Sequence, residues 1–458
     1  MLNRRDFLIA TTATAGLVGC SSIEMVPEAA GRGSYIDGVV LPENQNVVVL
    51  WTDRMLQAVA DKNFNPPAAT RGLSICHVAG FEAANAIEQK YQSLLTLPPA
   101  PPNIDPKLAY EAAVLTCINT AFQTAYRVAD FQTHQSASGD KTESLRWGSR
   151  VANLVLNMRS TDGAREASNQ IYAQHGRRRD NLGWEPTGPY FGAPAGVHIP
   201  LSRAPGLLPG WGYQSPWVIR TASQFRAGPF PEEGSPEFLR QARKVKELGG
   251  MDSAVRTADN AEVAFFWEDG PKGITPPGHW QLLALDIYQN RDMSFIDQAR
   301  AAALLSVAQA DGAICTWDTK YYHDIVRPET VIRSRAPSLA TAELQALHDP
   351  TWKTLSPTPP FPAYTSGHSC FSAASARMIA NIIGTDRVSF SGTAPDLINW
   401  PTQLRGVRRS WTSLSQAAEE GGMSREYGGI HWESDNTEGL IAGRALSDHV
   451  FASAFQHV

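Results

Sequence analysis

Three short stretches of this 458-residue chain contain residue types that bind a compact, highly charged oxyanion. The central stretch, residues 361–371, reads Phe-Pro-Ala-Tyr-Thr-Ser-Gly-His-Ser-Cys-Phe. Within it, Ser366 offers a hydroxyl, Gly367 lets the backbone approach a ligand closely, and His368 can exchange a proton near neutral pH. The triplet alone is weak evidence, because a serine at a helix start often has only a capping role.

The other two stretches add fixed positive charge. Lys320 and Arg327 are seven residues apart, or two helical turns, so the spacing predicts that both side chains leave one face of a helix. Arg425 and His431 are separated by a stretch with two adjacent glycines, which predicts a turn that brings them together. Three cations, a hydroxyl, a glycine N–H and two imidazoles suit phosphate or a phosphate-shaped metal oxide.

The three stretches, Lys-x6-Arg-Pro, Ser-Gly-His and Ser-Arg-x5-His-x3-Asp, occur in an order that resembles the vanadium-dependent haloperoxidases and the related type 2 phosphatidic acid phosphatases. The resemblance runs from about residue 47 to the C terminus, and it departs from the family at Thr365, where proline is usual. It implies an all-α fold of two helical bundles with long connecting loops. Trp317 and Phe361 stand where vanadium chloroperoxidases carry aromatic residues beside the halide.

The resemblance also implies a cofactor and a reaction. Vanadate would be the cofactor, with phosphate able to occupy the same site, and His431 would be its only covalent protein ligand. His368 would act as the acid and base toward hydrogen peroxide, and Lys320 would polarise the peroxide. Halide attack would then give hypohalous acid, which halogenates a small organic acceptor. The groups expected to hold the oxyanion are Lys320, Arg327, Ser366, the Gly367 N–H and Arg425.

Two acidic residues are candidates for supporting this site. Asp435 lies four residues after His431 and could either orient the imidazole or cap the following helix. Asp269 resembles a family acidic residue that supports the site arginine. Other polar residues on the predicted helices are expected to be structural: His77, Glu82, His279 and His323.

Two other functions are compatible with these residues. A phosphohydrolase would use His431 to attack phosphorus through a phosphohistidine intermediate and His368 to protonate the leaving group, because vanadate imitates the phosphoryl transition state. A non-catalytic binding lipoprotein would keep a vestigial site. The presence of every charged residue of the motif argues against the vestigial site.

Residues 1–19 are expected to be an export signal. Arg4 and Arg5 precede a mildly apolar run, and Leu-Val-Gly-Cys ending at Cys20 resembles a lipobox. We therefore expect twin-arginine export and a periplasmic or outer-membrane-anchored protein lipidated at Cys20. Residues 20–46 would be a flexible tether with a reach of roughly 25 to 30 Å. No later run approaches the ~18 to 20 apolar residues of a spanning helix, so the lipid would be the only membrane contact.

The charge balance and the cysteines indicate whether nucleic acid is a partner and whether the thiols are buried. With 40 basic and 45 acidic residues the chain has a net charge of -5, which gives no indication of nucleic-acid binding. The four cysteines beyond Cys20 are expected to be buried thiols, since each lies in an apolar helical context. They are Cys76, Cys117, Cys315 and Cys370.

Hydrophobic periodicity predicts helices in two halves. The first half, 47–230, would contain helices at 47–60, 73–87, 107–133 and 142–158, followed by a glycine- and proline-rich crossover at 162–231. The second half, 231–458, would carry the site. Its predicted helices start at 235 and then cover 257–267, 277–288, 293–323, 366–383, 396–409, 413–420 and 436–455. We expect Arg327-Pro328 to end the helix that delivers Lys320, and no sustained strand pattern is present.

Overall fold

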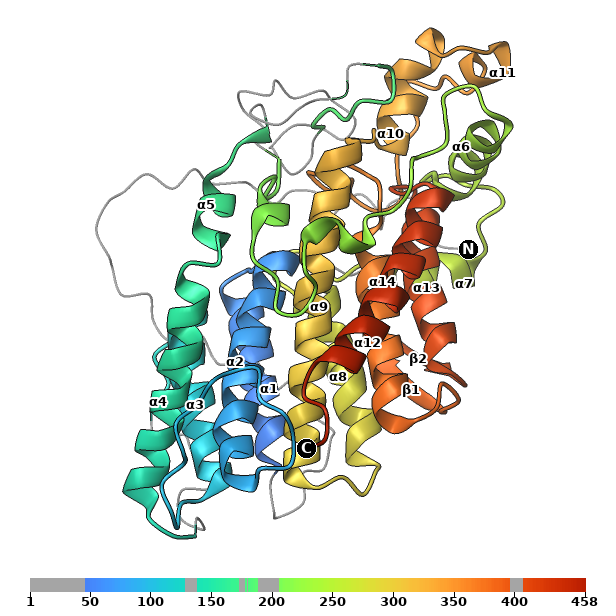
Figure 1. The fold of residues 1–458 in the computed structure, drawn as a ribbon. Coiled ribbons are helices and arrows are strands. Elements are labelled where there is room, and N and C mark those ends of the chain that lie inside the picture. The colour runs from blue at the N-terminus through green and yellow to red at the C-terminus, as the bar shows by residue number, and fades with distance from the viewer. Residues whose placement is uncertain (1–45, 128–137, 173–177, 179, 188–205, 396–406) are drawn as a thin grey trace, which may run out of the picture.

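The computed structural model describes residues 46–127, 138–172, 178, 180–187, 206–395 and 407–458. Within these ranges the chain is mainly helical, with one pair of short strands (Figure 1). The prediction of a helical fold is therefore confirmed. The export signal, Cys20 and the tether lie outside the described residues.

Four long helices form the N-terminal half, and local capping explains where each begins. Each is preceded by an asparagine or aspartate whose side chain accepts a hydrogen bond from a backbone N–H of the first turn. The helices are α1 (Val47–Asp61), α2 (Pro66–Glu88), α3 (Pro106–Ala121) and α4 (Lys141–Ser160).

The third helix is shorter than predicted. α3 ends at Ala121, whereas apolar spacing predicted a helix to residue 133, of which residues 128–133 lie outside the described ranges. The end has a tertiary cause: Phe122 packs edge-to-face on Phe64, with ring centroids 5.2 Å apart. Gln123 then adopts a left-handed backbone conformation with φ 54°. Packing of one aromatic residue thus overrides a continuing apolar pattern.

The described parts of the crossover hold only short helices and are packed through aromatic side chains. Trp184 is buried and lies edge-on to Tyr172, at 4.8 Å between ring centroids. Arg178, from the run of three arginines, pairs with Asp180 at 2.6 Å; the other two arginines lie outside the described residues. The short helices are α5 (Ala164–Asn169), η4 (Trp211–Tyr213) and η5 (Ala222–Phe225).

The remaining helices follow from residue 236. They are α6 (Pro236–Gly249), α7 (Ala258–Phe266), α8 (Thr275–Gln289), α9 (Phe295–His323), α10 (Pro328–Thr330), η6 (Val331–Arg335), η7 (Ala336–Ser338), α11 (Ala342–Gln345), α12 (Gly367–Ile383), α13 (Leu414–Tyr427) and α14 (Glu433–Ser453). In Figure 1 the 29-residue α9 runs through the middle of the molecule, between α2 and the α12–α14 group. One buried apolar cluster includes residues of α1–α4 and of α8, α9 and α12–α14, so the core continues across the predicted boundary at 230/231.

A β-hairpin-like pair was not predicted. β1 (Phe390–Thr393) and β2 (Arg408–Trp411) pair antiparallel, with Phe390 opposite Trp411. The helix expected at 396–409 is therefore wrong at residues 408 and 409, while 396–406 lie outside the described residues. The pair is stabilised by aromatic contact, since the Phe390 and Trp411 ring centroids are 5.1 Å apart.

The helix that carries Lys320 ends at His323, the residue predicted for its end, so Arg327 lies outside it and reaches the site by another route. α9 stops at His323 because Asp324 takes a left-handed conformation with φ 54°, and Arg327 lies beyond it as the N-cap of α10. The prediction that Lys320 and Arg327 share one helical face is therefore wrong. The Asp324 carboxylate is held by the Tyr172 hydroxyl at 2.6 Å. The two cations reach the site from separate elements.

All four described cysteines are free and buried, as expected from their apolar surroundings. None of the helices that the structure describes is long and apolar enough to cross a membrane.

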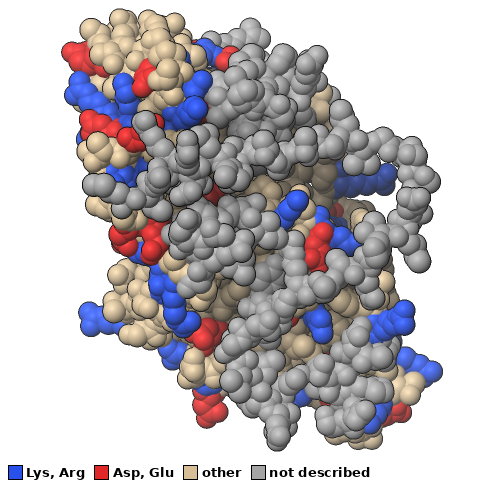
Figure 2. All heavy atoms as spheres, turned by 180° about the vertical axis from the view of Figure 1, so that it is seen from behind, with Lys and Arg blue, Asp and Glu red and all other residues tan. Residues whose placement is uncertain are grey.

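On the face shown in Figure 2, basic and acidic side chains are interspersed among uncharged ones rather than gathered by sign.

Candidate active site

The N-terminus of α12 supplies the backbone part of the site. Ser366 is the N-cap, and its hydroxyl oxygen accepts the Ser369 N–H at 3.2 Å. A Cβ added to Gly367 would make ordinary van der Waals contact with the Trp317 and Phe371 rings, at 3.7 Å each, so the protein leaves room for a group of that size and no more beside this residue. A 17-residue helix that begins in this way directs unpaired N–H groups and a positive dipole end at its first turn.

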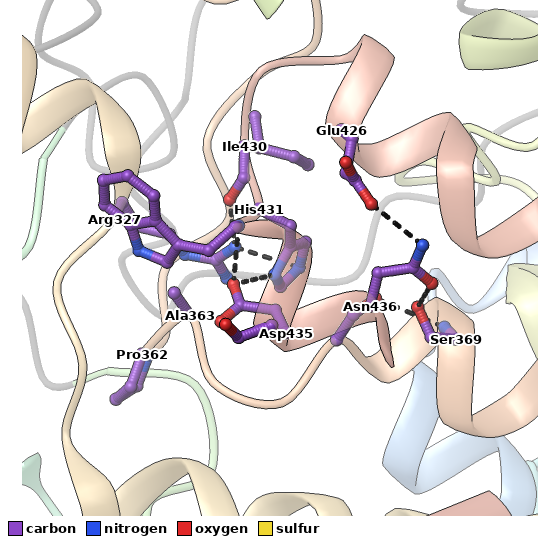
Figure 3. A network of polar contacts seen from close by, with 12 residues as sticks. Arg327, Pro362, Ala363, Ser369, Glu426, Ile430, His431, Asp435 and Asn436 are labelled. Carbon is purple, nitrogen blue, oxygen red and sulfur yellow. Dashed lines mark hydrogen bonds and ion pairs between the residues drawn. The ribbon is translucent and has the colours of Figure 1, made fainter. Parts of the chain in front are cut away.

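His431 is held in one orientation from both sides of its ring (Figure 3). Its Nδ1 lies 2.7 Å from the Asp435 carboxylate, and its Nε2 lies 3.0 Å from Nη1 of Arg327. Because an arginine only donates, Nε2 must be the acceptor and Nδ1 must carry the proton. The pKa of His431 is lowered well below its ordinary value, first by burial and then by the charges of Arg327, Lys320 and Arg425. A neutral imidazole with its lone pair on Nε2 is the form that ligates a metal.

Asp435 performs both of the roles that the sequence left open. Its carboxylate accepts from His431 Nδ1, and the same oxygen accepts the Trp432 N–H at 3.0 Å at the start of α14. Its backbone carbonyl accepts the Ser366 N–H at 2.9 Å. This one residue therefore connects the imidazole, the α14 N-terminus and the α12 N-terminus.

Lys320 and Arg327 converge on the same loop from different elements. The Lys320 side chain is fully buried and donates to the carbonyls of Pro362 and Ala363, at 3.0 Å each. Arg327 donates from Nε to the Phe361 carbonyl at 2.9 Å, and the Phe361 ring lies 4.8 Å from Lys320 Nζ and 5.0 Å from the Arg327 guanidinium. Burial and then the nearby Arg327 charge lower the pKa of Lys320 well below its ordinary value.

Arg425 and His368 complete the group. Arg425 lies on the last turn of α13 and donates to the Trp267 carbonyl at 3.3 Å. His368 is partly exposed, and its Nε2 donates to the Glu268 carbonyl at 3.3 Å. Burial lowers the pKa of His368 well below its ordinary value, and the charges of Arg425 and Lys320 lower it further. The two residues therefore lie within electrostatic reach of each other and of Lys320.

The turn predicted between Arg425 and His431 is present. α13 ends at Tyr427, Gly429 has φ 78°, and the Ile430 N–H donates back to the Arg425 carbonyl at 3.1 Å. Gly429 also sits against the backbone of Gly249, because a Cβ there would lie 2.3 Å from the Gly249 carbonyl oxygen. Glycine is needed at this position for both its conformation and its close contact.

Trp317 and Phe361 form an aromatic pair beside these groups. Their ring centroids are 5.1 Å apart with the planes at 49°. The Trp317 indole N–H donates to the Leu207 carbonyl at 3.0 Å, so the polar edge of the indole is occupied by the protein. The pair is therefore an apolar wall next to a cationic site.

Asp269 contacts a histidine in the structure. Its carboxylate lies 3.1 and 3.2 Å from His279 Nδ1, and both side chains are buried. Arg425 reaches the backbone of the same segment through the Trp267 carbonyl. Support of Arg425 by the Asp269 carboxylate stays a prediction.

His323 donates from Nε2 to the Ala227 carbonyl at 3.0 Å and packs edge-on against Tyr364.

Sequence reasoning missed a buried polar network behind the site (Figure 3). Asn436 accepts from the Ser369 hydroxyl at 2.8 Å and donates to Glu426 at 2.9 Å, and Glu426 pairs with Lys244 at 2.8 Å. The network joins α12, α14, α13 and α6. Its only signal in the sequence is that Glu426 and Asn436 directly follow Arg425 and Asp435 on the same helices.

The donor set fits an oxyanion with one covalent protein ligand. Among the described residues there is no group of three or more His, Cys, Asp and Glu side chains that could hold a metal cation. Instead, one imidazole lone pair on Nε2 faces hydrogen-bond donors and fixed positive charge. Vanadate, a metal oxide with charged oxygens, matches these groups, whereas a bare cation would be repelled by three positive side chains.

Known proteins that resemble this chain in sequence or fold are vanadium-dependent haloperoxidases. Residues 300–458 match the family model described as the second helical-bundle domain of VCPO, vanadium chloroperoxidase. Vanadium chloroperoxidase from Curvularia inaequalis is 24% identical in an alignment 318 positions long, which covers 55% of this chain and 50% of that protein. A solved bacterial vanadium-dependent iodoperoxidase superposes with a TM-score of 0.74 at 26% identity, over 89% of this chain and 96% of that one. The chain is thus similar to vanadium-dependent haloperoxidases in sequence and in fold, and residues 300–458 match a domain of that family.

One further solved structure has the same fold at a lower sequence identity. The apo form of a bacterial vanadium-dependent chloroperoxidase has a TM-score of 0.64 at 15% identity, over 85% of this chain and 94% of that one. At that identity the likeness concerns the fold alone. The aligned region spans about half the length of the fungal chloroperoxidase. The matched second-bundle domain starts at residue 300 and includes every proposed oxyanion-binding residue.

Proposed function

We propose that this protein is a vanadium-dependent haloperoxidase that oxidises halide with hydrogen peroxide to hypohalous acid. The observation that carries the proposal is the state of His431, whose Nε2 lone pair faces Arg327 while Asp435 holds Nδ1. The similarity to a bacterial iodoperoxidase and a fungal chloroperoxidase supports the same activity. The hypohalous acid would react with a small organic acceptor.

Vanadate would be bound by the residues that converge at this point. His431 Nε2 would be the covalent ligand, and the oxygens would be held by Lys320, Arg327, Ser366, the Gly367 N–H and Arg425. When bound, vanadate would supply an electrophilic centre that activates peroxide toward halide without changing its oxidation state. Binding should be strong because burial and then the nearby Arg327 charge lower the pKa of Lys320, and an oxyanion would give Lys320 a counter-charge.

His368 would manage the proton of hydrogen peroxide. Its depressed pKa leaves the ring neutral near pH 7, so it can take a proton from an incoming peroxide. Lys320 has three N–H donors and two of them are used by the carbonyls of residues 362 and 363, which leaves one for an oxygen at the site. Removing that positive donor would reduce the polarisation of the reacting oxygen.

The aromatic wall would control which halide reacts. Trp317 and Phe361 lower the hydration of an approaching halide, while the neighbouring cations attract it. Chloride is the hardest of the three common halides to oxidise, so a site that oxidises it should also accept bromide and iodide. We propose a chloroperoxidase-like selectivity on this basis.

One feature also favours a phosphohydrolase as the second candidate. A histidine nucleophile needs a lone pair on Nε2 and a carboxylate at Nδ1; His431 has that lone pair, which faces Arg327, and Asp435 lies 2.7 Å from its Nδ1. His368 would then protonate the leaving group. The same cationic groups would bind a phosphoryl group, so geometry alone serves both reactions.

Steady-state assays on one purified preparation separate the two candidates. Turnover of chloride, bromide and iodide with peroxide should appear only after vanadate is added. Hydrolysis of a generic phosphomonoester should be slow and should be inhibited by vanadate. A preparation that hydrolyses the phosphomonoester and oxidises no halide when vanadate is present would exclude the haloperoxidase.

A further inference from the structure

We propose that residues 206–208, which we call the Leu207 strap, position the aromatic wall, and that Tyr321 and Gly206 thereby determine halide selectivity. This inference deepens the proposed function and rests on it. Tyr321 follows Lys320 directly in the chain, and it belongs to the Tyr-Tyr-His stretch that the motif pattern leaves without a role.

A single peptide unit ties both sides of the wall together. The Leu207 N–H donates to the Pro360 carbonyl at 2.9 Å, immediately before Phe361. The Leu207 carbonyl accepts the Trp317 indole N–H at 3.0 Å and the Tyr321 hydroxyl at 2.8 Å. Both lone pairs of this oxygen are therefore used by α9, while the amide holds the loop before α12. Movement of Leu207 would release Trp317 and the Phe361 loop at once.

The strap approaches Tyr321 so closely that only glycine fits next to it. Gly206 has φ 73°, and a Cβ there would lie 2.9 Å from the Tyr321 hydroxyl oxygen and 3.3 Å from Cβ of Tyr172. Leu208, a non-glycine residue, also has a positive φ of 50°. Such a backbone persists only when surrounding contacts hold it, and the Tyr321 hydroxyl is one of those contacts.

The hydrogen bond to Leu207 decides what Trp317 presents to the site. With its N–H held by the strap, the indole cannot turn its polar edge toward a halide, and its ring remains against Phe361. Loss of the Tyr321 hydroxyl would leave the phenyl ring in place and remove one of the two bonds to the Leu207 oxygen. A looser wall excludes water less well, and this should hinder chloride, the most strongly hydrated of the three halides, more than iodide.

The test uses two substitutions that disturb the contact between Gly206 and the Tyr321 hydroxyl, one on each side of it. Tyr321→Phe deletes the hydroxyl, and Gly206→Ala pushes against it. Matched controls are Tyr322→Phe, a neighbouring tyrosine that is 63% exposed, and Gly384→Ala, where φ is also positive at 78° but an added Cβ meets nothing within 4 Å. Each vanadate-loaded protein is assayed for kcat and halide KM with chloride and iodide, with bromide in place of chloride if the parent protein leaves chloride unoxidised.

We expect each strap variant to lower the chloride-to-iodide ratio of kcat/KM at least threefold, mainly through a higher chloride KM. Vanadate affinity should change less than twofold, and both controls should match the parent protein. The double variant should lose less than the product of the two single effects, because Gly206→Ala no longer meets a hydroxyl when residue 321 is Phe. Without vanadate, hydrogen exchange at the Leu207 amide should be faster in both variants.

The outcomes separate this inference from the proposed function. An unchanged halide ratio in both strap variants, with faster amide exchange, would show that the strap does not set selectivity. Unchanged exchange would show that Tyr321 does not hold the strap. If the parent protein oxidises no halide, the proposed function fails and this inference fails with it.

Discussion

At the scale of single residues, the two histidines of the site differ in what holds them. His431 is fixed by a carboxylate at Nδ1 and by Arg327 at Nε2, whereas His368 has a backbone carbonyl at Nε2 and is partly exposed. A ligand must keep its lone pair in a fixed direction, while an acid–base residue must exchange protons with solvent or substrate. The surroundings thus assign the two rings different roles.

His431→Ala and His368→Ala should therefore have different effects on vanadate. His431→Ala deletes the covalent ligand and should weaken vanadate binding more than about 100-fold, because loss of a residue that only supports a metal ligand already costs about 10- to 100-fold. His368→Ala should leave binding largely intact and lower turnover by roughly 10²- to 10⁴-fold, the usual contribution of a general acid–base group. Vanadium content should be measured beside rate.

An exposed histidine provides the control for this comparison. His348→Ala lies on the surface and should leave both vanadium content and rate unchanged. Equal loss of vanadium from the His431 and His368 variants would contradict the separate roles.

The candidate site residues could be proposed from the sequence because the motif places them in three short stretches. The spacing also predicted the turn before His431 correctly. Its route for Arg327 was wrong, since the helix ends at His323 and Arg327 lies beyond it. Long-range contacts such as Lys320 with the carbonyls of residues 362 and 363, or Ser369 with Asn436, join positions far apart in the chain and carry no local pattern.

At the scale of elements, the helix boundaries were predicted unevenly: α2 begins at Pro66 rather than at the predicted residue 73, whereas α12 ends at Ile383 as predicted. Ser235 before Pro236 and Thr257 cap α6 and α7 as expected, because capping depends on adjacent residues. The end of α3 and the β1–β2 pair, which were not predicted, depend on contacts between residues distant in the chain, such as Phe122 with Phe64 and Phe390 with Trp411. Apolar spacing contains no information on these contacts.

The turn between α13 and α14 should be sensitive to one methyl group. Gly429→Ala places a side chain at φ 78° and a Cβ 2.3 Å from the Gly249 carbonyl oxygen, which the backbone can only accept by moving. We expect a loss of unfolding free energy of more than about 2 kcal/mol and weaker vanadate binding, since a left-handed residue alone costs about 1 to 2 kcal/mol.

Gly384→Ala is the matched control for the turn. Gly384 also has φ 78°, but an added Cβ meets nothing within 4 Å, so only the conformational cost applies. Its vanadate affinity should equal that of the parent protein. If both variants lose the same stability and bind vanadate equally well, contact with Gly249 does not position the turn.

Helix α2 contains a carboxyl group whose burial should make stability depend on pH. Burial of Glu82 raises its pKa from 4.5 to about 7, although hydrogen bonds from Ser93 and Leu94 act in the opposite direction. The carboxyl is protonated in the folded and unfolded protein below pH 4.5, and between pH 4.5 and about 7 only the unfolded protein ionises freely. The contribution of Glu82 to the free energy of unfolding is thus fully present below pH 4.5 and is lost as pH rises through about 7.

Glu82→Gln should remove this dependence because the amide stays neutral. Relative to the parent protein, the variant should gain up to about 3 kcal/mol between pH 4.5 and 8, taking 1.36 kcal/mol for each pKa unit. Urea unfolding of both proteins at the two pH values measures the difference. A stability difference that is the same at both pH values would contradict a raised carboxyl pKa.

At the scale of the whole molecule, an acidic chain concentrates positive charge in its interior. The net charge is -5, yet Lys320, Arg327 and Arg425 are each at most 3% exposed. These residues come from α9, the α10 N-cap and α13, and the core that holds them continues into the N-terminal helices. The cationic site therefore depends on the packed domain, because no single segment assembles it.

The dependence of the cationic site on a folded domain is relevant to the route by which the protein would be exported from the cytoplasm. The Arg4-Arg5 pair predicts the twin-arginine route, which carries folded proteins, and a domain whose site forms only after folding suits that route. Replacing both arginines by lysine keeps the charge and should leave the precursor in the cytoplasm, as judged by cell fractionation. Cys20→Ser should still be exported but should lose the lipid, which mass spectrometry of the membrane fraction would detect. Unchanged export of the double-lysine variant would contradict the twin-arginine prediction, and an unlipidated mature chain would contradict the lipobox.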